Sequence, residues 1–391
     1  MDPLTLLQGD FPARDLFDQV CQQLPSWSYE DARAFLERLV RTGSNDDDRT
    51  RAIMVLSLLM DRRYQLGIMK RSRLLALVDR SFAQLVDSIR ETPSPRYDWT
   101  GFGRPLPEPR DSGATLVVDA RGYPPEGNAS LARALVMAYE RGFQRLIVAN
   151  TRGQRFIGCG LGSGTDGLHI DVYGSSGDYL ASGIDGAEVI VHGSAQDQLA
   201  QIMKGGKLIV YGDAGQTFMY AAKGGDAFIM GNAAGRPLIN AVGRPRVVIN
   251  GTCLDYLAES FMAGDPLNGG GFVIVNGIRL DDEGTIHDLD TPYPGGNLFS
   301  LASGGAIYIR DPRHRVTVDQ LNGGEFTALT VQDWDRIRPY LEENEALFGI
   351  PLKRLLTLNG SLQAPAQIYR KIRPAGHKAL MPEEAWVRRE A

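Results

Sequence analysis

The fold is decided by the stretch GAEVIVHGSAQDQLAQIMKGGKLIVYGDAGQTFMYAAKGGDAFIMG, residues 186–231. Within it, a short apolar run ends on a glycine, and the same arrangement returns 19 residues later. Extending the alignment in both directions yields six such glycines: Gly174, Gly193, Gly212, Gly231, Gly251 and Gly277. Their successive spacings are 19, 19, 19, 20 and 26 residues. Such regularity indicates an internal repeat, and a repeat outranks any single motif as a guide to the fold.

The residues before each of these glycines follow one rule. The fourth and second positions upstream are aliphatic in all six repeats, namely Ile170/Val172, Val189/Val191, Leu208/Val210, Ala227/Ile229, Val247/Ile249 and Val273/Val275. The fifth position upstream varies and is His169, Glu188, Lys207, Asp226, Arg246 and Phe272. This alternation predicts short strands with one face turned inward. In most repeats another glycine precedes the strand, as expected for a tight corner.

A second apolar position follows each strand. It lies six or seven residues beyond the corner glycine and is occupied by Leu180, Leu199, Phe218, Leu238 and Leu257. Nineteen residues broken by corners leave no room for a ten-residue helix, and a propeller blade needs about 40 residues. We therefore predict a mainly β fold, a parallel β-helix whose coils stack about 4.8 Å apart. Inward columns of aliphatic residues would form its core, each side chain contributing roughly 1.5–3 kcal/mol.

The flanking sequence divides into four further parts. Residues 1–91 have helical periodicity, with a capping-box-like start at Ser28 and Asp31. Residues 92–113 contain five prolines and are predicted to form a linker. Residues 114–150 predict a βαβ-like connector without a GxGxxG motif. The β-helix is expected over 151–311, and a C-terminal tail with one helix, at about 330–348, over 312–391.

Composition restricts the function classes. The net charge of −5 over 391 residues gives no indication of binding to nucleic acid or to an acidic membrane. The three cysteines, Cys21, Cys159 and Cys253, are far apart and form no CxxC motif, so we expect no zinc or iron–sulfur site in this chain. The first residues, MDPLTLLQGDFPARD, do not resemble a signal peptide, and no apolar run is long enough for a transmembrane helix. We expect a cytoplasmic protein.

The repeats resemble a known family. The segments that carry the resemblance are GSSGDYLASGI (174–184), GSAQDQLAQIMKGG (193–206), GDAGQTFMYAAKGG (212–225) and GNAAGRPLINAVGRPRVVING (231–251). They are similar to the GXGXG domain at the C-terminal end of the glutamate synthase large subunit, and to one of the components of formylmethanofuran dehydrogenase. The resemblance covers about residues 150–311 and implies a right-handed β-helix. It also implies partners, an amidotransferase subunit and a synthase subunit that carries FMN and an iron–sulfur cluster.

The departures from this family matter as well. Glutamate synthase uses an N-terminal cysteine to hydrolyse glutamine, whereas this chain begins MetAspPro and its first cysteine is Cys21. The FMN-binding barrel and the clustered cysteines of the iron–sulfur site have no counterpart. We therefore expect a subunit that is not catalytic alone and binds no cofactor itself. It would act in nitrogen metabolism and glutamate biosynthesis as a structural wall and docking surface of a glutamate-synthase-like oxidoreductase complex.

Two other functions remain open. One is a binding module for an anionic carrier or cofactor in a formyl-transfer-type complex. The other is a β-helix enzyme with its own site. The candidate contact residues are Arg236, Asn240, Arg244 and Arg246, because arginine suits carboxylates and phosphates. Structural pairing with Asp226 or Asp255 is the alternative. We assign no catalytic and no metal-binding residue, and we regard the six corner glycines as structural.

Three further groups of residues have a structural and a functional interpretation. Cys159 is expected to be a buried small side chain, since no base lies near it in the sequence. His169 and His192 fall in different columns of successive repeats and are not expected to face each other. Asp178, Asp197 and Asp255 share a column and form either a solvated corner or a cation site.

Overall fold

Amphipathic helices form the first part of the chain in the computed structural model, which describes residues 3–9, 11–42 and 45–376. These helices are η1 (Pro3–Gln8), α1 (Ala13–Gln23), η2 (Leu24–Ser26), α2 (Tyr29–Thr42), α3 (Asp46–Asp61) and α4 (Arg71–Glu91). Before α2, the backbone N–H of Ser28 donates to Asp31 Oδ2 (2.9 Å), and that of Asp31 donates to Ser28 Oγ (3.2 Å). These reciprocal bonds confirm the predicted helix start.

A parallel βαβ unit follows the helices. It comprises β2 (Thr115–Asp119), α5 (Leu131–Glu140) and β3 (Arg145–Arg152), as the sequence predicts. Ser130 caps α5 by accepting a hydrogen bond from the backbone N–H of Arg133. One strand was not predicted: β1 (Tyr97–Gly101) lies in the proline-rich segment and pairs in parallel with β2.

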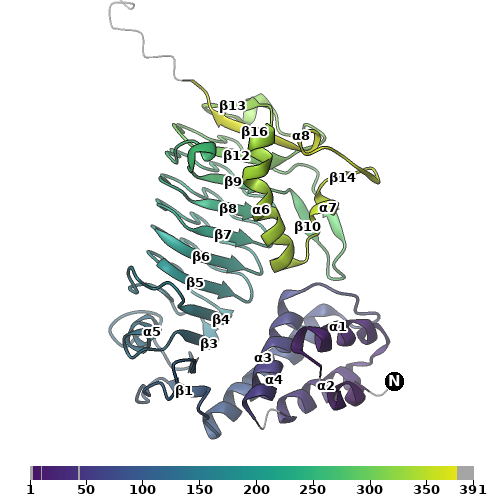
Figure 1. The fold of residues 1–391 in the computed structure, drawn as a ribbon, viewed down its shortest axis with the longest axis vertical. Helices are drawn as coiled ribbons and strands as arrows, with labels where there is room; N and C mark the ends of the chain where they lie inside the picture. Colours follow the sequence, from purple (N-terminus) through teal and green to yellow (C-terminus); the bar gives the residue numbers. More distant parts are fainter. Residues whose placement is uncertain (1–2, 10, 43–44, 377–391) are drawn as a thin grey trace, which may run out of the picture.

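The repeats contribute the middle of one long sheet (Figure 1). Their strands are β4 (His169–Ser175), β5 (Asp185–Val191), β6 (Gly205–Val210), β7 (Asp226–Ile229), β8 (Arg246–Ile249), β9 (Phe272–Val275) and β12 (Ala306–Arg310). The twelve strands run in the order β1 to β9, then β12, β16 (Tyr369–Pro374) and β13 (Gly324–Thr327). All neighbours are parallel except the pairs that involve β16.

The predicted fold class, a mainly β chain built on a right-handed parallel β-helix, is wrong. The structure is an α/β fold with one open, mostly parallel sheet that ends at β1 and β13. In each repeat the chain forms only one strand of that sheet and then returns through an irregular segment, which we call the return segment. The sequence period reveals the repeat, but it does not determine whether the return segments pair as further sheets.

The predicted columns of aliphatic residues are confirmed. Ile170 pairs with Val189, Val189 with Leu208, Leu208 with Ala227, and Ala227 with Val247. All five are fully buried in one hydrophobic core. The second apolar position, Leu180, Leu199, Phe218, Leu238 and Leu257, lies in the same core. The sheet and the return segments therefore enclose a continuous apolar interior.

The return segments have an unusual backbone. Alternate residues adopt positive φ although they are not glycine, for example Gln198 (φ 56°), Ala200 (φ 52°) and Ile202 (φ 58°). The backbone N–H of Ala200 donates to Leu180 O in the preceding repeat (2.8 Å). Those of Gln198 and Ile202 donate to the following repeat, at 2.7 and 2.8 Å. Hydrogen bonds in both directions thus satisfy backbone donors that would otherwise be costly to bury.

Four of the six corner glycines, Gly174, Gly212, Gly231 and Gly251, are placed where a side chain would collide with the preceding repeat. A Cβ on Gly212, Gly231 or Gly251 would lie 2.2–2.5 Å from a polar side-chain atom of that repeat. Gly174 combines a φ of +107° with a Cβ position 2.6 Å from Thr151 O. Close stacking of the repeats, more than left-handed backbone, accounts for most of these glycines.

Helices cover the outer face of the sheet at both ends of the molecule (Figure 1). The N-terminal helices bury Val117, Ile147, Ala149 and Tyr173 on β2 to β4. Helix α6 (Val331–Phe348) covers β6 to β9 and β12, as predicted for the helix at about 330–348. Asn344 of α6 and Asn250 exchange two buried hydrogen bonds, at 2.8 and 2.9 Å. No described helix is both long and apolar enough to span a bilayer.

The remaining elements are short. They are η3 (Pro266–Asn268), β10 (Ile278–Leu280), β11 (Ile286–Asp288), η4 (Val318–Gln320), α7 (Leu352–Leu355), β14 (Thr357–Leu358), β15 (Ser361–Leu362) and α8 (Pro365–Ile368). Strands β10 and β11 form a hairpin between β9 and β12, and β14 and β15 form a second one. The last part of the predicted C-terminal tail, 377–391, lies outside the described residues.

Candidate functional site between the helices and the sheet

A single carboxylate interrupts an apolar column on the outer face of the sheet. Asp171 of β4 pairs with Ile147 of β3 and Ile190 of β5, and the column continues through Ile209 and Phe228. Burying an ionised group in such surroundings is unfavourable unless a partner compensates it. The structure provides that partner in the neighbouring strand and helix.

His192 lies between two carboxylates. Its Nδ1 is 2.9 Å from Asp61 Oδ2 at the end of α3, and its Nε2 is 3.1 Å from Asp171 Oδ1. The side chains of His192 and Asp61 are each only 5% exposed. Burial opposes the charge on His192, but Asp61 and Asp171 outweigh this effect and raise the pKa of His192 to about 10. His192 is therefore an imidazolium at neutral pH, with both ring nitrogens donating.

Aromatic rings enclose this imidazolium. The Tyr173 ring stacks on His192 with centroids 4.0 Å apart, and Phe82 of α4 stacks on the other side of Tyr173 at 4.1 Å. Tyr211 lies beyond His192, at 5.9 Å. The Tyr173 hydroxyl and Ser57 Oγ of α3 are 2.7 Å apart. The rings favour the cation through their π faces and hold helices α3 and α4 against the sheet.

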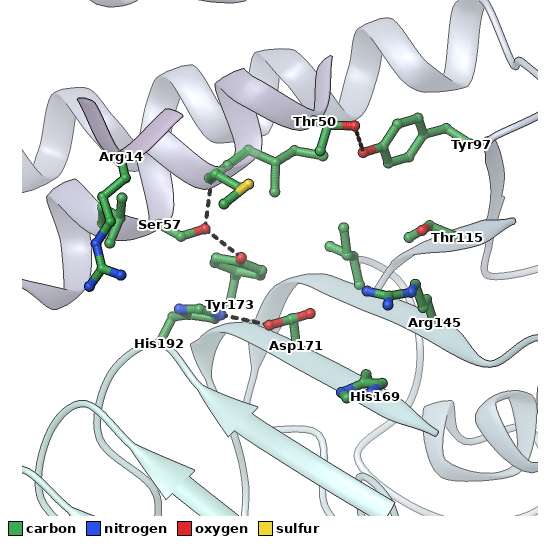
Figure 2. Close-up of a pocket in the computed structure, with 14 residues that line it drawn as sticks. Arg14, Thr50, Ser57, Tyr97, Thr115, Arg145, His169, Asp171, Tyr173 and His192 are labelled. Carbon is green, nitrogen blue, oxygen red and sulfur yellow. Dashed lines mark hydrogen bonds and ion pairs between the residues drawn. The ribbon is translucent and has the colours of Figure 1, made fainter. Parts of the chain in front are cut away.

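A cavity of about 400 Å³ opens beside this cluster. Figure 2 shows α3 on one side of it, with Thr50 and Ser57, and the strands on the other, with Asp171 and Tyr173. Ile53, Met54, Leu58 and Ile147 supply apolar lining. Three further groups that line it, Arg14, Arg145 and His169, are basic side chains that are exposed or half-buried. We call this space the junction cavity.

The structure separates Arg246 from the other three candidate contact residues. Arg246 begins β8, and its Nη1 donates to the Tyr340 hydroxyl of α6 (2.6 Å), so it lies under the helix. Arg236 is in a return segment, 3.1 Å from Glu259, with its guanidinium over Tyr256. Asn240 contacts the Tyr220 hydroxyl at 3.5 Å. Arg244 is exposed at the corner before β8.

The variable position before each strand has a clear electrostatic role. Cross-strand neighbours in this column are Arg145, His169, Glu188, Lys207, Asp226 and Arg246. Apart from His169, their charges alternate in sign, which is the favourable arrangement for adjacent strands. His169 Nδ1 lies 3.3 Å from Glu188 Oε1, and Lys207 also forms an ion pair with Glu343 of α6. Arg246 is thus the cross-strand neighbour of Asp226.

The aspartate column at the corners binds backbone. Asp197 Oδ1 accepts from the N–H of Gln216 (2.8 Å), and Asp255 Oδ1 accepts from that of Gly296 (2.6 Å). Asp178 lies 3.6 Å from Arg155. The residues that the structure describes contain no group of three or more His, Cys, Asp or Glu able to hold a metal ion.

All three cysteines are free thiols with raised pKa values. Burial raises the pKa of Cys21 and of Cys159 to about 12, and it raises that of Cys253 further. Cys159 Sγ donates to Tyr179 O (3.0 Å). At neutral pH these side chains are protonated, and a protonated thiol is a poor nucleophile.

Sequence reasoning missed the junction cavity. Its lining comes from α1, α3 and four strands, and His192 and Asp61 are 131 residues apart. The two histidines do lie in different columns, but both line the cavity. One signal was available: Asp171 stands at a position where the following repeats have isoleucine, phenylalanine or valine.

A known protein family matches the part of the chain that contains the repeats. A family model described as "GXGXG motif" matches residues 131–363, which is more than half of the chain. The match begins with α5 and runs through the repeats to β15. Among curated proteins, none matches the sequence.

Proposed function

Because the chain belongs to the GXGXG motif family, we propose that it is a non-catalytic subunit of a glutamate-synthase-like assembly. Its stacked repeats form a rigid wall that docks a catalytic partner. The amidotransferase activity, the FMN and the iron–sulfur cluster reside on partner subunits. The free cysteines are consistent with a reducing compartment, and we place the assembly in the cytoplasm.

The observation that carries the docking role is an exposed strip on the return segments. Ile202, Met262 and Leu301 are large apolar side chains that are 42%, 50% and 71% exposed. Ile202 and Lys204 lie on one return segment and Lys223 on the next, so the two lysines are about one strand spacing of roughly 4.8 Å apart, whereas Met262 and Leu301 belong to the return segments of later repeats. Neither lysine has an ion-pair partner among the described residues. We call these five residues the return strip.

The return strip has the chemistry of a binding surface. Two unpaired like charges at neighbouring positions are unfavourable in the free chain, and they become favourable when a carboxylate approaches. The exposed apolar side chains of the return segments would be buried by the same partner. A partner surface with acidic residues around an apolar patch therefore fits this strip.

The raised pKa values of the cysteines support the proposal that this chain does not itself hydrolyse glutamine. A cysteine-dependent amidotransferase requires a thiolate close to a base. In this chain burial keeps the three thiols protonated. The nucleophile of the assembly would therefore belong to a partner.

Purification of the tagged full chain from its native host tests the proposal. We expect an amidotransferase and a protein with flavin and iron–sulfur absorbance to co-purify. The double variant Lys223→Glu/Leu301→Glu should lose both, whereas Ile68→Asp, at an exposed apolar residue among the N-terminal helices, should retain them. Recovery of the wild-type chain alone would overturn the proposal that it belongs to such an assembly. Glutamine hydrolysis by the purified chain would overturn the non-catalytic role.

A further inference from the structure

The cluster of Asp61, Asp171 and His192 beside the junction cavity has two acidic groups and one basic group. Two carboxylates, Asp61 and Asp171, share one imidazolium, so the cluster carries one net negative charge when both acids are ionised. Both Asp61 oxygens lie within 3.1 Å of His192 Nδ1, and the Asp61 side chain is only 5% exposed. Asp171 uses only Oδ1 for His192, and its Oδ2 has no hydrogen-bond partner among the described residues. In Figure 2 this second oxygen points away from His192.

Asp171 is therefore the group that can receive a ligand's positive charge. Its side chain is 31% exposed and lines the cavity. The Tyr173 ring, two residues along the same strand, lines the cavity as well. A carboxylate beside an aromatic ring suits an ammonium group, which gains a charge-assisted hydrogen bond and a cation–π contact.

A complementary positive charge lies close by. Arg145 of β3 pairs with His169, so it is the diagonal neighbour of Asp171 on the same face. Their Cα atoms are roughly 8 Å apart, given strands about 4.8 Å apart and a rise of about 3.3 Å per residue. Within the described chain, Arg145 has no carboxylate partner. The long arginine side chain can bridge this span to a carboxylate held next to the ammonium.

The rest of the cavity is apolar. Ile53, Met54 and Leu58 of α3 face Ile147 of β3 across it. Met54 is 48% exposed although it belongs to a helix that packs on the sheet. A volume of about 400 Å³ lies within the usual range for small-molecule sites, about 300–1,000 Å³. The cavity therefore has room for a branched or aromatic side chain.

We propose that the junction cavity binds a zwitterionic α-amino acid with an apolar side chain. Asp171 receives the ammonium group, Arg145 receives the carboxylate, and the side chain lies between α3 and the sheet. A simple cation would have no group to contact Arg145 or the apolar lining. A simple anion would be repelled by the carboxylate of Asp171. Only a molecule with both charges next to an apolar group matches all three features. This binding is independent of the proposed assembly.

Calorimetric titration of the full chain tests the site with L-leucine and its two half-molecules. 4-Methylpentanoate lacks the ammonium group, and 3-methylbutylamine lacks the carboxylate. We expect L-leucine, or L-methionine or L-phenylalanine, to bind at millimolar or lower concentration, and each half-molecule to bind at least roughly tenfold more weakly, as loss of one charge-assisted hydrogen bond implies. Equal binding of 4-methylpentanoate and L-leucine would overturn the proposal, as would absence of binding by all three amino acids.

Matched variants assign the binding to this cavity. Arg145→Gln should weaken L-leucine binding at least roughly tenfold. Arg152→Gln, at an exposed arginine of the same strand outside the cavity, should leave it unchanged. Asp171→Asn, which keeps the side-chain shape, should also abolish binding. An equal Kd for the two arginine variants would refute the site, and unfolding curves of both variants check that they remain folded.

Discussion

Replacing His192 by phenylalanine tests whether the buried ion cluster joins the N-terminal helices to the sheet. Phenylalanine preserves an aromatic ring between Tyr173 and Tyr211 and removes both hydrogen bonds. Asp61 is then left buried without its partner. Removing one member of a buried ion pair costs about 3–5 kcal/mol. We expect His192→Phe to lower the free energy of unfolding by an amount in that range at neutral pH.

The pH dependence of this loss follows from the pKa of His192. The folded value is raised to about 10 from 6.5, so the cluster stabilises the fold fully below pH 6.5. This stabilisation declines as the pH rises through 10, where the imidazolium loses its proton. The difference in unfolding free energy between wild type and His192→Phe should therefore shrink by about 1.4 kcal/mol per pH unit between these limits.

Urea unfolding followed by circular dichroism at several pH values measures this difference. His169→Phe is the control, because His169, at the start of β4, is 38% exposed and its one ion pair among the described residues is with Glu188 at 3.3 Å. Its loss should cost at most about 1 kcal/mol. Equal losses of unfolding free energy in the two variants would refute the claim that the charged cluster holds the helices on the sheet. A difference in unfolding free energy between wild type and His192→Phe that stays constant up to pH 10 would refute it as well.

Three further predictions concern the repeats and α6. Leu208→Ala should lower the free energy of unfolding by about 2–5 kcal/mol in urea titrations, since it opens a cavity in the column of buried aliphatic residues; a loss below about 1 kcal/mol would contradict continuous packing. Gly206→Ala should lower the thermal midpoint because Gly206 has a φ of +89° and its Cβ would lie 2.3 Å from Ala187 O; an unchanged midpoint would argue against close stacking there. Asn344→Ala should cost about 1–3 kcal/mol in urea titrations because it removes both buried hydrogen bonds between α6 and Asn250, which keeps those with Ile229 O and Asn276; protection of α6 amides in hydrogen exchange should fall with it, and unchanged protection would contradict this role.

The aliphatic columns could be predicted from the sequence because a strand's inward positions have period two and the repeat has a nearly constant length. The path between the strands could not. Ala200 and Met219 adopt positive φ although neither residue favours it. Contacts between neighbouring repeats hold them there, and no local sequence signal marks such contacts. The prediction of a mainly β class failed for this reason, and because the covering helices were treated as separate from the sheet.

The candidate site was less predictable than the fold. Asp171 is recognisable as an exception within its column, but its partner His192 is explained only by the approach of α3. Among the candidate arginines, a single sequence segment contains Arg244 and Arg246, yet Arg246 begins β8 whereas Arg244 lies in the exposed corner before it. Proximity in sequence therefore grouped residues that the fold separates, with Arg246 beneath α6 and Arg236 in a return segment.

The length of α6 limits how far this architecture can be extended. Its 18 residues reach about 27 Å at 1.5 Å per residue, which is enough to cross five or six strands at about 4.8 Å. It covers β6 to β9 and β12, so the helix and the strands beneath it already match. Duplicating one repeat would lengthen the apolar interior. It would also add a strand whose outer apolar side chains α6 is too short to cover. Chains of this type should therefore gain or lose whole repeats only together with about one turn of the covering helix.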